Sequence, residues 1–196
     1  MKLFGITGGI GSGKTVVATE LLRSGYPVYF TDLQAQHIIH HNPCVRSQIE
    51  LLFGSDIYQN DHLDRARVAE LVFNNPQLLT RLNSIVHPAV RFDIQAWASK
   101  NEAHDFCFVE SAILFESGLN TLCDAVITVN APLETRIQRT VMRDNTTRDS
   151  VISRLKNQMT DEDRTARADF HVENNGTKEI SRICLDILSF CRNFAD

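Results

Sequence analysis

The chain has 196 residues, of which 43% are hydrophobic, and its formal net charge at pH 7 is −4. This length suits one globular domain with a sizeable core and small inserted lobes. The negative net charge excludes a general basic surface for nucleic acid, so we expect no nucleic-acid partner.

The first thirty residues predict the start of a parallel α/β sheet. Residues 2–7 are short and apolar and end at glycines, which is typical of a buried strand. Residues 14–25 have helical spacing and stop at Gly25, a suitable C-cap, and residues 26–30 form a second apolar run. A strand, a loop, a helix and a second strand in this order indicate an α/β fold.

The character of the sequence changes after the second strand. Residues 33–103 show helical periodicity and no convincing strand pattern. A helical stretch of this length is too long for one crossover, so we interpret it as an inserted helical lobe. Within it we expect His87-Pro88 to begin a helix, because proline is favourable at the first helical position.

The rest of the chain returns to the strand pattern around an arginine-rich helical segment. Strands are expected over 105–110, 124–129 and 170–174, and an amphipathic helix closes the chain. We therefore predict a P-loop NTPase fold, a three-layer α/β/α arrangement with a five-stranded parallel sheet. Its predicted parts are the core (1–32, 104–133 and 168–196), the helical lobe (33–103) and a helical lid (134–167).

A complete phosphate-binding motif, G-x-x-x-x-G-K-[ST], lies between the first strand and the first helix. Its glycines allow backbone amides to turn toward one point, and the positive end of the following helix also attracts phosphate. We therefore predict that ATP is bound by the residues of this loop and its helix: Gly8, Gly9, Gly11, Ser12, Gly13, Lys14, Thr15 and Val16.

The motif also predicts individual roles. Lys14 is expected to bridge the β- and γ-phosphates, and Thr15 to place its hydroxyl group on Mg²⁺. Val16 has no side-chain donor, so its backbone N–H is expected to hold the α-phosphate. Glu110, at the end of the third predicted strand, either holds a Mg²⁺-bound water or pairs with a lid arginine. ATP and Mg²⁺ are thus the predicted cofactors.

The acceptor of the phosphoryl group has to be inferred from other segments. The sequence contains neither the [N/T]-K-x-D motif of GTP switches nor the L-S-G-G-Q motif of ABC-type ATPases. Asp32 directly follows the second strand, where a carboxylate can accept the proton of an attacking hydroxyl group. Alternatively, Thr31 or Asp32 is the N-cap of the next helix. A small-molecule kinase is the favoured class.

Several motifs along the chain resemble those of the dephospho-CoA kinase family. The matching segments are GITGGIGSGKT (5–15), Asp32, LDRARVAELVF (63–73), LNSIVHP (82–88), LFE (114–116), RTVMRD (139–144), TR (147–148), Gln158 and ADFHVENNG (168–176). The resemblance implies transfer of the γ-phosphate of ATP to the ribose 3′-hydroxyl of dephospho-CoA. The sequence departs from the family pattern at Ala112, where proline is usual, and at Val16, where threonine is frequent.

The resemblance also implies roles for single residues. Asp32 is the general base, and Lys14 and an arginine of 139–143 stabilise the transferring phosphoryl group; we choose Arg143 for this role. The lobe binds the CoA part of the acceptor, and the lid covers ATP. Because Arg139 and Arg143 share one helical face, one is expected to stack on adenine and the other to reach the phosphates, with a solvated basic face as the alternative.

Further candidates depend mainly on the resemblance. Asn175 is expected at the ATP site. Arg65 either meets a phosphate of dephospho-CoA or has no special role, and His87 either binds the substrate or has a local structural role. Glu116 either contacts the substrate or fixes a loop, and we favour the loop. A kinase for another small hydroxyl compound, such as a nucleoside monophosphate or a sugar acid, and a regulatory ATPase are the alternative functions.

The remaining expectations concern location and assembly. No apolar run approaches the roughly 20 residues that span a bilayer, so we expect no membrane partner, and the first residues do not resemble a signal peptide. Five cysteines form no C-x-x-C pair, which favours reduced thiols and a cytoplasmic location. We expect a monomer or a small homo-oligomer.

Overall fold

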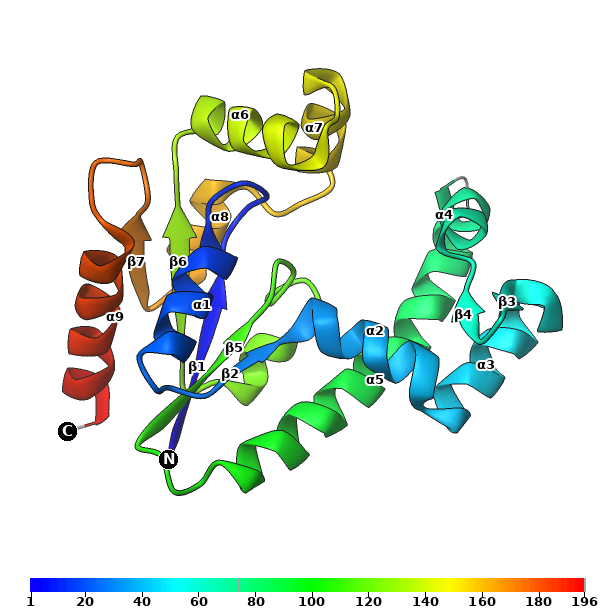
Figure 1. The fold of residues 1–196 in the computed structure, drawn as a ribbon, viewed down its shortest axis with the longest axis horizontal. Coiled ribbons are helices and arrows are strands. Elements are labelled where there is room, and N and C mark those ends of the chain that lie inside the picture. The colour runs from blue at the N-terminus through cyan, green and yellow to red at the C-terminus, as the bar shows by residue number, and fades with distance from the viewer. Residues whose placement is uncertain (74, 196) are drawn as a thin grey trace. The chain divides into compact units, whose positions relative to one another are not determined.

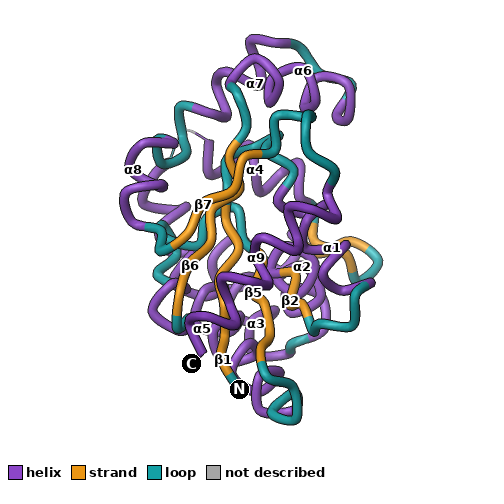
Figure 2. Tube along the Cα trace, turned by 90° about the vertical axis from the view of Figure 1, so that its left-hand side faces the viewer, coloured by secondary structure: helices purple, strands orange, loops and turns teal. Residues whose placement is uncertain are grey.

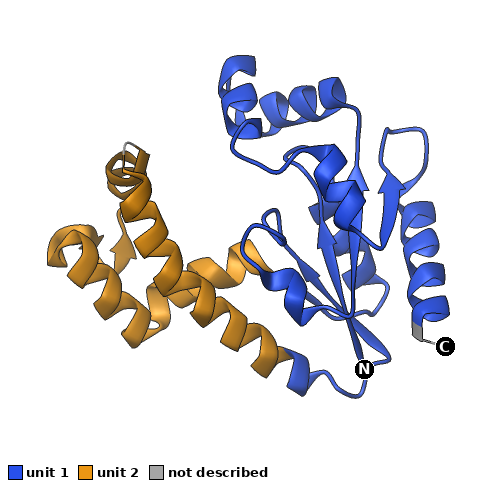
Figure 3. Ribbon diagram, turned by 180° about the vertical axis from the view of Figure 1, so that it is seen from behind, with its two compact units in different colours: residues 1–29, 98–196 blue, residues 30–97 orange. Residues whose placement is uncertain are grey.

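The computed structural model describes residues 1–73 and 75–195, which form two compact units (Figure 1). One unit consists of Met1–Tyr29 and Ala98–Asp196, and the other of Phe30–Trp97 (Figure 3). Within the described ranges no helix is long and apolar enough to cross a membrane. All five cysteines are free thiols, as expected.

A five-stranded sheet forms the centre of the first unit. Its order is β2 (Val28–Phe30), β5 (Phe106–Glu110), β1 (Lys2–Thr7), β6 (Ala125–Asn130) and β7 (Phe170–Glu173). Strand β1 pairs in parallel with β5 and β6, and β6 pairs in parallel with β7 (Figure 2). The strands β1, β5 and β6 are almost fully buried, which explains their continuous apolar sequence. The predicted α/β fold with a five-stranded parallel sheet is confirmed.

Helices cover both faces of this sheet. Helix α1 (Lys14–Arg23) packs against α9 (Ile180–Ala195), and α8 (Asp161–Arg167) packs on β6, behind the sheet in the view of Figure 1. Phe4 of β1 is fully buried and contacts the rings of Phe106, Phe108 and Phe190 at centroid distances of 6.0–6.3 Å. These apolar contacts form part of the buried core of the unit.

The arginine-rich segment forms three helices instead of one continuous helical run. They are α6 (Leu133–Asp144), α7 (Arg148–Leu155) and α8. Outside this segment, η2 (Leu119–Leu122) is a short 3₁₀ helix before β6. Helix α6 ends because Asn145 adopts a left-handed conformation with φ 47°. The side chains of Thr147 and Thr160 then cap α7 and α8 by accepting hydrogen bonds from the N–H groups of Ser150 and Asp163.

The second unit is mainly helical. It contains α2 (Thr31–His41), α3 (Pro43–Phe53), η1 (Ser55–Ile57), α4 (Arg65–Phe73) and most of α5 (Pro76–Lys100). It also contains the antiparallel pair β3 (Tyr58–Gln59) and β4 (His62–Leu63), so the expectation of a lobe without strands is wrong. Asn60 and Asp61 join the two strands with φ values of 49° and 64°, as a tight hairpin requires. Two-residue strands are too short for a detectable alternating pattern.

The prediction that His87-Pro88 begins a helix is also wrong. Pro88 lies inside α5, which starts at Pro76 instead. The side chain of Asn75 accepts a hydrogen bond from the N–H of Leu78 at 3.1 Å, so a capped start lies upstream. Proline removes one backbone donor from the helix. The buried residues Val86 and Val90, on either side of Pro88, nevertheless keep one continuous packed face.

Candidate active site

The glycine loop connects β1 to α1, and its conformation requires glycine at two positions. Gly11 and Gly13 have φ values of 78° and 90°, in the left-handed region that glycine tolerates. A β-carbon at Gly11 would collide with the carbonyl oxygen of Arg136, and one at Gly13 with the side-chain amide of Asn174. The loop is therefore a close-fitting backbone turn at the positive end of α1, the geometry that binds phosphate.

A charged cluster lies where this loop enters α1. The Lys14 Nζ atom lies 3.8 Å from Glu110 Oε1, and the hydroxyl of Thr15 donates a hydrogen bond to the same oxygen at 2.9 Å. Glu110 is only 3% exposed. The structure therefore brings together a cation, a hydroxyl group and a carboxylate from β5 and α1. Glu110 thus contacts Thr15, the residue predicted to hold Mg²⁺, and the metal role of Glu110 stays a prediction.

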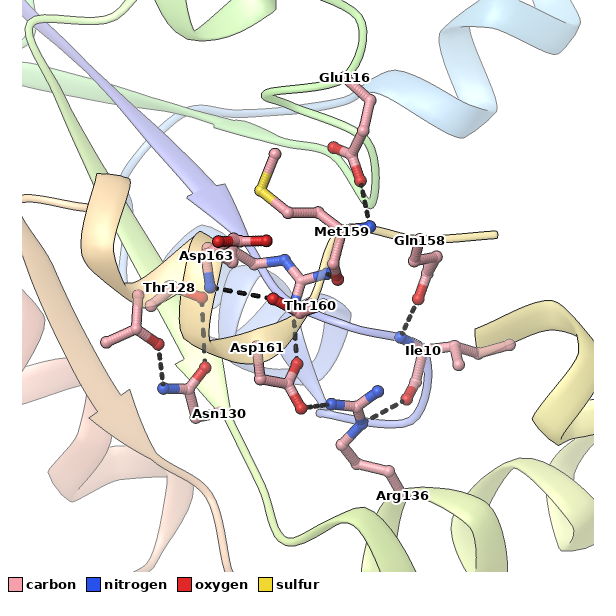
Figure 4. Close-up of polar contacts among 12 residues, drawn as sticks. Ile10, Glu116, Thr128, Asn130, Arg136, Gln158, Met159, Thr160, Asp161 and Asp163 are labelled. Atoms are coloured by element: carbon pink, nitrogen blue, oxygen red, sulfur yellow. Dashed lines mark hydrogen bonds and ion pairs between the residues drawn. The ribbon is translucent and has the colours of Figure 1, made fainter. Parts of the chain in front are cut away.

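Residues of the arginine-rich segment contact the backbone of the glycine loop at Ile10 (Figure 4). The Nε atom of Arg136 donates to the carbonyl oxygen of Ile10 at 3.0 Å, and the N–H of Ile10 donates to Gln158 Oε1 at 2.9 Å. Arg136 also forms an ion pair with Asp161. The sequence reasoning assigned no role to Arg136. Its only sequence signal was its place three residues before Arg139, on the same face of α6.

Arg139 lies beside the glycine loop, with its Nη1 atom 3.9 Å from the position of a β-carbon at Gly13. Its Nη1 atom donates to the carbonyl oxygen of Asn174 at 3.0 Å. Asn174 is 5% exposed, and its side chain donates to the carbonyl oxygen of Ser12 at 2.9 Å. The side chain of Asn175 accepts from Thr177 instead. The sequence predicts Asn175 at the ATP site and has no signal that singles out Asn174, although both belong to the same N-N-G turn.

Arg143 lies further along α6 and is more exposed. Its Nε atom lies 2.7 Å from Asp144 Oδ1, and its side chain is 62% exposed. Asp144 also pairs with Arg154. The hydrogen bonds from Arg143 and Arg154 lower the pKa of Asp144 to about 2. The structure thus places Arg143 in a surface ion-pair cluster, the arrangement given above as the alternative for this helical face.

Glu116 holds the segment between α7 and α8. Its carboxylate accepts a hydrogen bond from the backbone N–H of Met159 at 3.1 Å, next to Gln158 (Figure 4). This contact agrees with the favoured prediction that Glu116 fixes a loop. Because Gln158 contacts Ile10, Glu116 supports the glycine loop indirectly.

The second unit contains a cavity of about 380 Å³ that brings two predicted substrate residues together. It is lined by Asp32, Ala35, Gln36, Ile39, His40, Leu63 and Arg65. Asp32 is exposed and lies in the first turn of α2, whose N-cap is Phe30. The alternative in which Thr31 or Asp32 caps this helix is therefore wrong. The cavity offers a carboxylate, an amide, an imidazole and a guanidinium group to a polar ligand.

Two histidines of this unit have lowered pKa values. Burial lowers the pKa of His40, and the positive field of His62 acts in the same direction. Burial also lowers the pKa of His87, which is half-buried on α5. Both shifts favour the neutral imidazole over the charged form. His40 lines the cavity. Among the described residues that line it, His87 does not occur.

Comparisons with known proteins agree with these features. A family described as dephospho-CoA kinase matches residues 2–179. A dephospho-CoA kinase of Porphyromonas gingivalis is 46% identical over 81% of this chain and 78% of its own length. A crystal structure of a Thermus thermophilus protein, TT1252, is 34% identical with a TM-score of 0.85, covering 96% and 97% of the two chains. A dephospho-CoA kinase structure from Campylobacter jejuni is 25% identical with a TM-score of 0.71, covering 95% of each chain.

Proposed function

The chain belongs to the dephospho-CoA kinase family, and we propose that it transfers the γ-phosphoryl group of ATP to the ribose 3′-hydroxyl of dephospho-CoA. The products are coenzyme A and ADP. The observation that carries this proposal is the glycine loop, where Lys14 and Thr15 both contact the buried carboxylate of Glu110. The family match over residues 2–179 supports it.

The glycine loop is the proposed donor site. Its backbone amides and the positive end of α1 bind the phosphates of ATP, and the backbone N–H of Val16 holds the α-phosphate. Lys14 bridges the β- and γ-phosphates. Arg139, whose side chain lies beside Gly13 of this loop, is proposed to contact ATP from α6. Asn174 contributes indirectly, because its hydrogen bond to Ser12 fixes the loop.

The residues at this site fit Mg²⁺. Thr15 and Glu110 offer a hydroxyl and a carboxylate oxygen, which are hard donors of the kind that Mg²⁺ prefers. We propose that Thr15 is a direct ligand and that Glu110 holds a water of the ion. When bound, Mg²⁺ neutralises charge on the β- and γ-phosphate oxygens.

The cavity of the second unit is the proposed acceptor site. Asp32 accepts the proton of the attacking hydroxyl group, which a general base within hydrogen-bond reach can do. Arg65 lines the same cavity and is proposed to bind a phosphate of dephospho-CoA, since a guanidinium group matches phosphate geometry. Residues 33–103 form the acceptor lobe in this proposal. His87 supports the lobe from within α5.

The helices after β6 are the proposed lid. Residues 134–167 carry contacts to the glycine loop and the exposed arginine cluster around Arg143. We propose that Arg143 leaves Asp144 when ATP is present and stabilises charge on the transferring phosphoryl group. Five free thiols support a reducing compartment and a cytoplasmic location. The proposed assembly is a monomer or a small homo-oligomer.

A coupled assay of ADP release tests the proposal. Purified protein receives Mg²⁺-ATP with dephospho-CoA, with AMP, with gluconate or with no acceptor. We expect ADP release that depends on dephospho-CoA. Equal release without any acceptor indicates a regulatory ATPase, and faster release with AMP or gluconate indicates a different kinase. Either result contradicts the proposed function.

A further inference from the structure

Ile10 is held by two side chains that have no part in the chemistry proposed above. Its carbonyl oxygen accepts from Arg136 on α6, and its N–H donates to Gln158 after α7 (Figure 4). The two distances are 3.0 and 2.9 Å, so both are well-formed hydrogen bonds. Both polar backbone groups of one residue in the glycine loop are therefore fixed from outside the loop.

Arg136 also packs directly on the loop backbone. A β-carbon at Gly9 would lie 2.6 Å from the Nη2 atom of Arg136. The Arg136 side chain is only 4% exposed. Its guanidinium group therefore occupies the space beside Gly9 and binds the carbonyl of the next residue, which restricts the path of the backbone at Gly9 and Ile10.

A shared carboxylate holds Arg136 in this position. Asp161, the first residue of α8, pairs with Arg136 and also accepts from Arg164 Nη1 at 2.6 Å. Arg164 is 1% exposed, and among the described residues its Nε atom has no hydrogen-bond partner. Two buried guanidinium groups thus share one carboxylate. Within this cluster one positive charge is in excess beside the loop, an arrangement that favours an incoming anion.

We propose that Arg136 is a positioning residue for the donor site. It holds Gly9 and Ile10 in the conformation in which the loop amides can bind phosphate, and Asp161 holds Arg136. This inference rests on the proposed function, because it takes the glycine loop as the ATP site. Arg136 acts through the backbone of the loop and does not itself contact the reacting atoms.

Three variants test this role: Arg136→Gln, Arg136→Lys and, as a control, Arg182→Gln. Arg182 forms an exposed pair with Asp186 on α9, away from the loop contacts. For Arg136→Gln we expect the KM for ATP to rise about tenfold or more, the effect of losing a hydrogen bond from a charged donor. The KM for dephospho-CoA should not change. Hydrogen exchange of residues 8–13 should become faster.

The lysine variant separates positioning from stability. A lysine can keep the ion pair with Asp161, but its single ammonium group cannot reproduce the fork geometry that also reaches the Ile10 carbonyl. We therefore expect Arg136→Lys to recover the melting temperature of the wild type while its KM for ATP stays raised. Arg182→Gln should leave both Michaelis constants and the loop exchange unchanged.

Two results would overturn the inference. One is an Arg136→Gln variant with a lowered melting temperature but unchanged KM for ATP and unchanged exchange of residues 8–13. The other is full recovery of the KM for ATP in Arg136→Lys, which assigns the role to charge alone. Failure of the proposed function is recognised separately, because the wild type then shows no ADP release that depends on dephospho-CoA. Loop exchange still tests Arg136 in that case.

Discussion

Replacing Glu110 should change both the free energy of unfolding and the Mg²⁺ dependence of the reaction rate. Glu110 is 3% exposed and contacts Lys14 at 3.8 Å and Thr15 at 2.9 Å. Removing one partner of a buried ion pair costs about 3–5 kcal/mol. Because 3.8 Å is long for an ion pair and Lys14 is 12% exposed, we expect Glu110→Ala to lower the free energy of unfolding by about 3 kcal/mol, the lower end of that range.

The isosteric variant separates the two effects. Glu110→Gln also loses the charge that pairs with Lys14, but its side-chain oxygen can still accept from Thr15. We therefore expect a loss that is smaller than in Glu110→Ala by about 1 kcal/mol, the value of a typical hydrogen bond. The missing charge should raise the Mg²⁺ concentration that gives half-maximal rate, because a neutral amide holds a metal-bound water less strongly. Urea denaturation followed by circular dichroism measures the first quantity, and a Mg²⁺ titration at saturating ATP measures the second.

Glu134→Gln is the matched control. Glu134 of α6 is exposed and pairs with Arg148 of α7. Its replacement should therefore change neither the free energy of unfolding nor the Mg²⁺ dependence. Unfolding of Glu110→Ala at the same urea concentration as the wild type would contradict the structural role of Glu110. The same Mg²⁺ dependence in Glu110→Gln and the wild type would contradict its role at the metal.

Three further predictions concern loop support and pH. Asn174→Ala removes the donor to Ser12 and should cost about 1–3 kcal/mol, with a raised KM for ATP; thermal denaturation and kinetics check this, and an unchanged melting temperature contradicts it. The pKa of His87 is lowered in the folded state. As the pH falls, the unfolded state therefore binds a proton at this histidine at a higher pH than the folded state does. Stability should therefore be full above the ordinary histidine pKa of about 6.5 and fall as the pH drops below it. His87→Gln should flatten this loss in urea denaturation at several pH values, and an unchanged slope contradicts it. Asp144, with its pKa near 2, contributes stability above its ordinary pKa that is lost as the pH falls toward 2; because the pair is exposed, Asp144→Asn should change stability at pH 7 by less than about 1 kcal/mol, and a larger change refutes this account.

The features that could be predicted from the sequence have short-range signals. Strands β1, β5 and β6 are apolar because both faces of the sheet are covered. The glycine loop has a fixed spacing and a fixed context. The sequence has no such signal for the hairpin of β3 and β4, whose strands are only two residues long. In α5, packing of the second unit outweighs the preference of Pro88 for the start of a helix.

The lid arginines show the limit of sequence reasoning most clearly. Arg136, Arg139 and Arg143 are three and four residues apart, so periodicity places all of them on one face of α6. Periodicity does not say which of them is buried. The Arg136 side chain is 4% exposed because the loop and Asp161 surround it, whereas the Arg143 side chain is 62% exposed. Only the tertiary contacts distinguish the two residues.

We propose that the chain phosphorylates the ribose 3′-hydroxyl of dephospho-CoA with Asp32 as the base. The most direct measurement compares the wild type and Asp32→Asn with Mg²⁺-ATP and dephospho-CoA, with mass spectrometry and phosphorus NMR locating the new phosphate. We expect a 3′-phosphate from the wild type and a loss of about 10²–10⁴-fold in kcat for Asp32→Asn, while ATP still raises the melting temperature of the variant. A phosphate at another position would contradict the proposed function, and a near-normal rate in Asp32→Asn would contradict the role of Asp32 as the base.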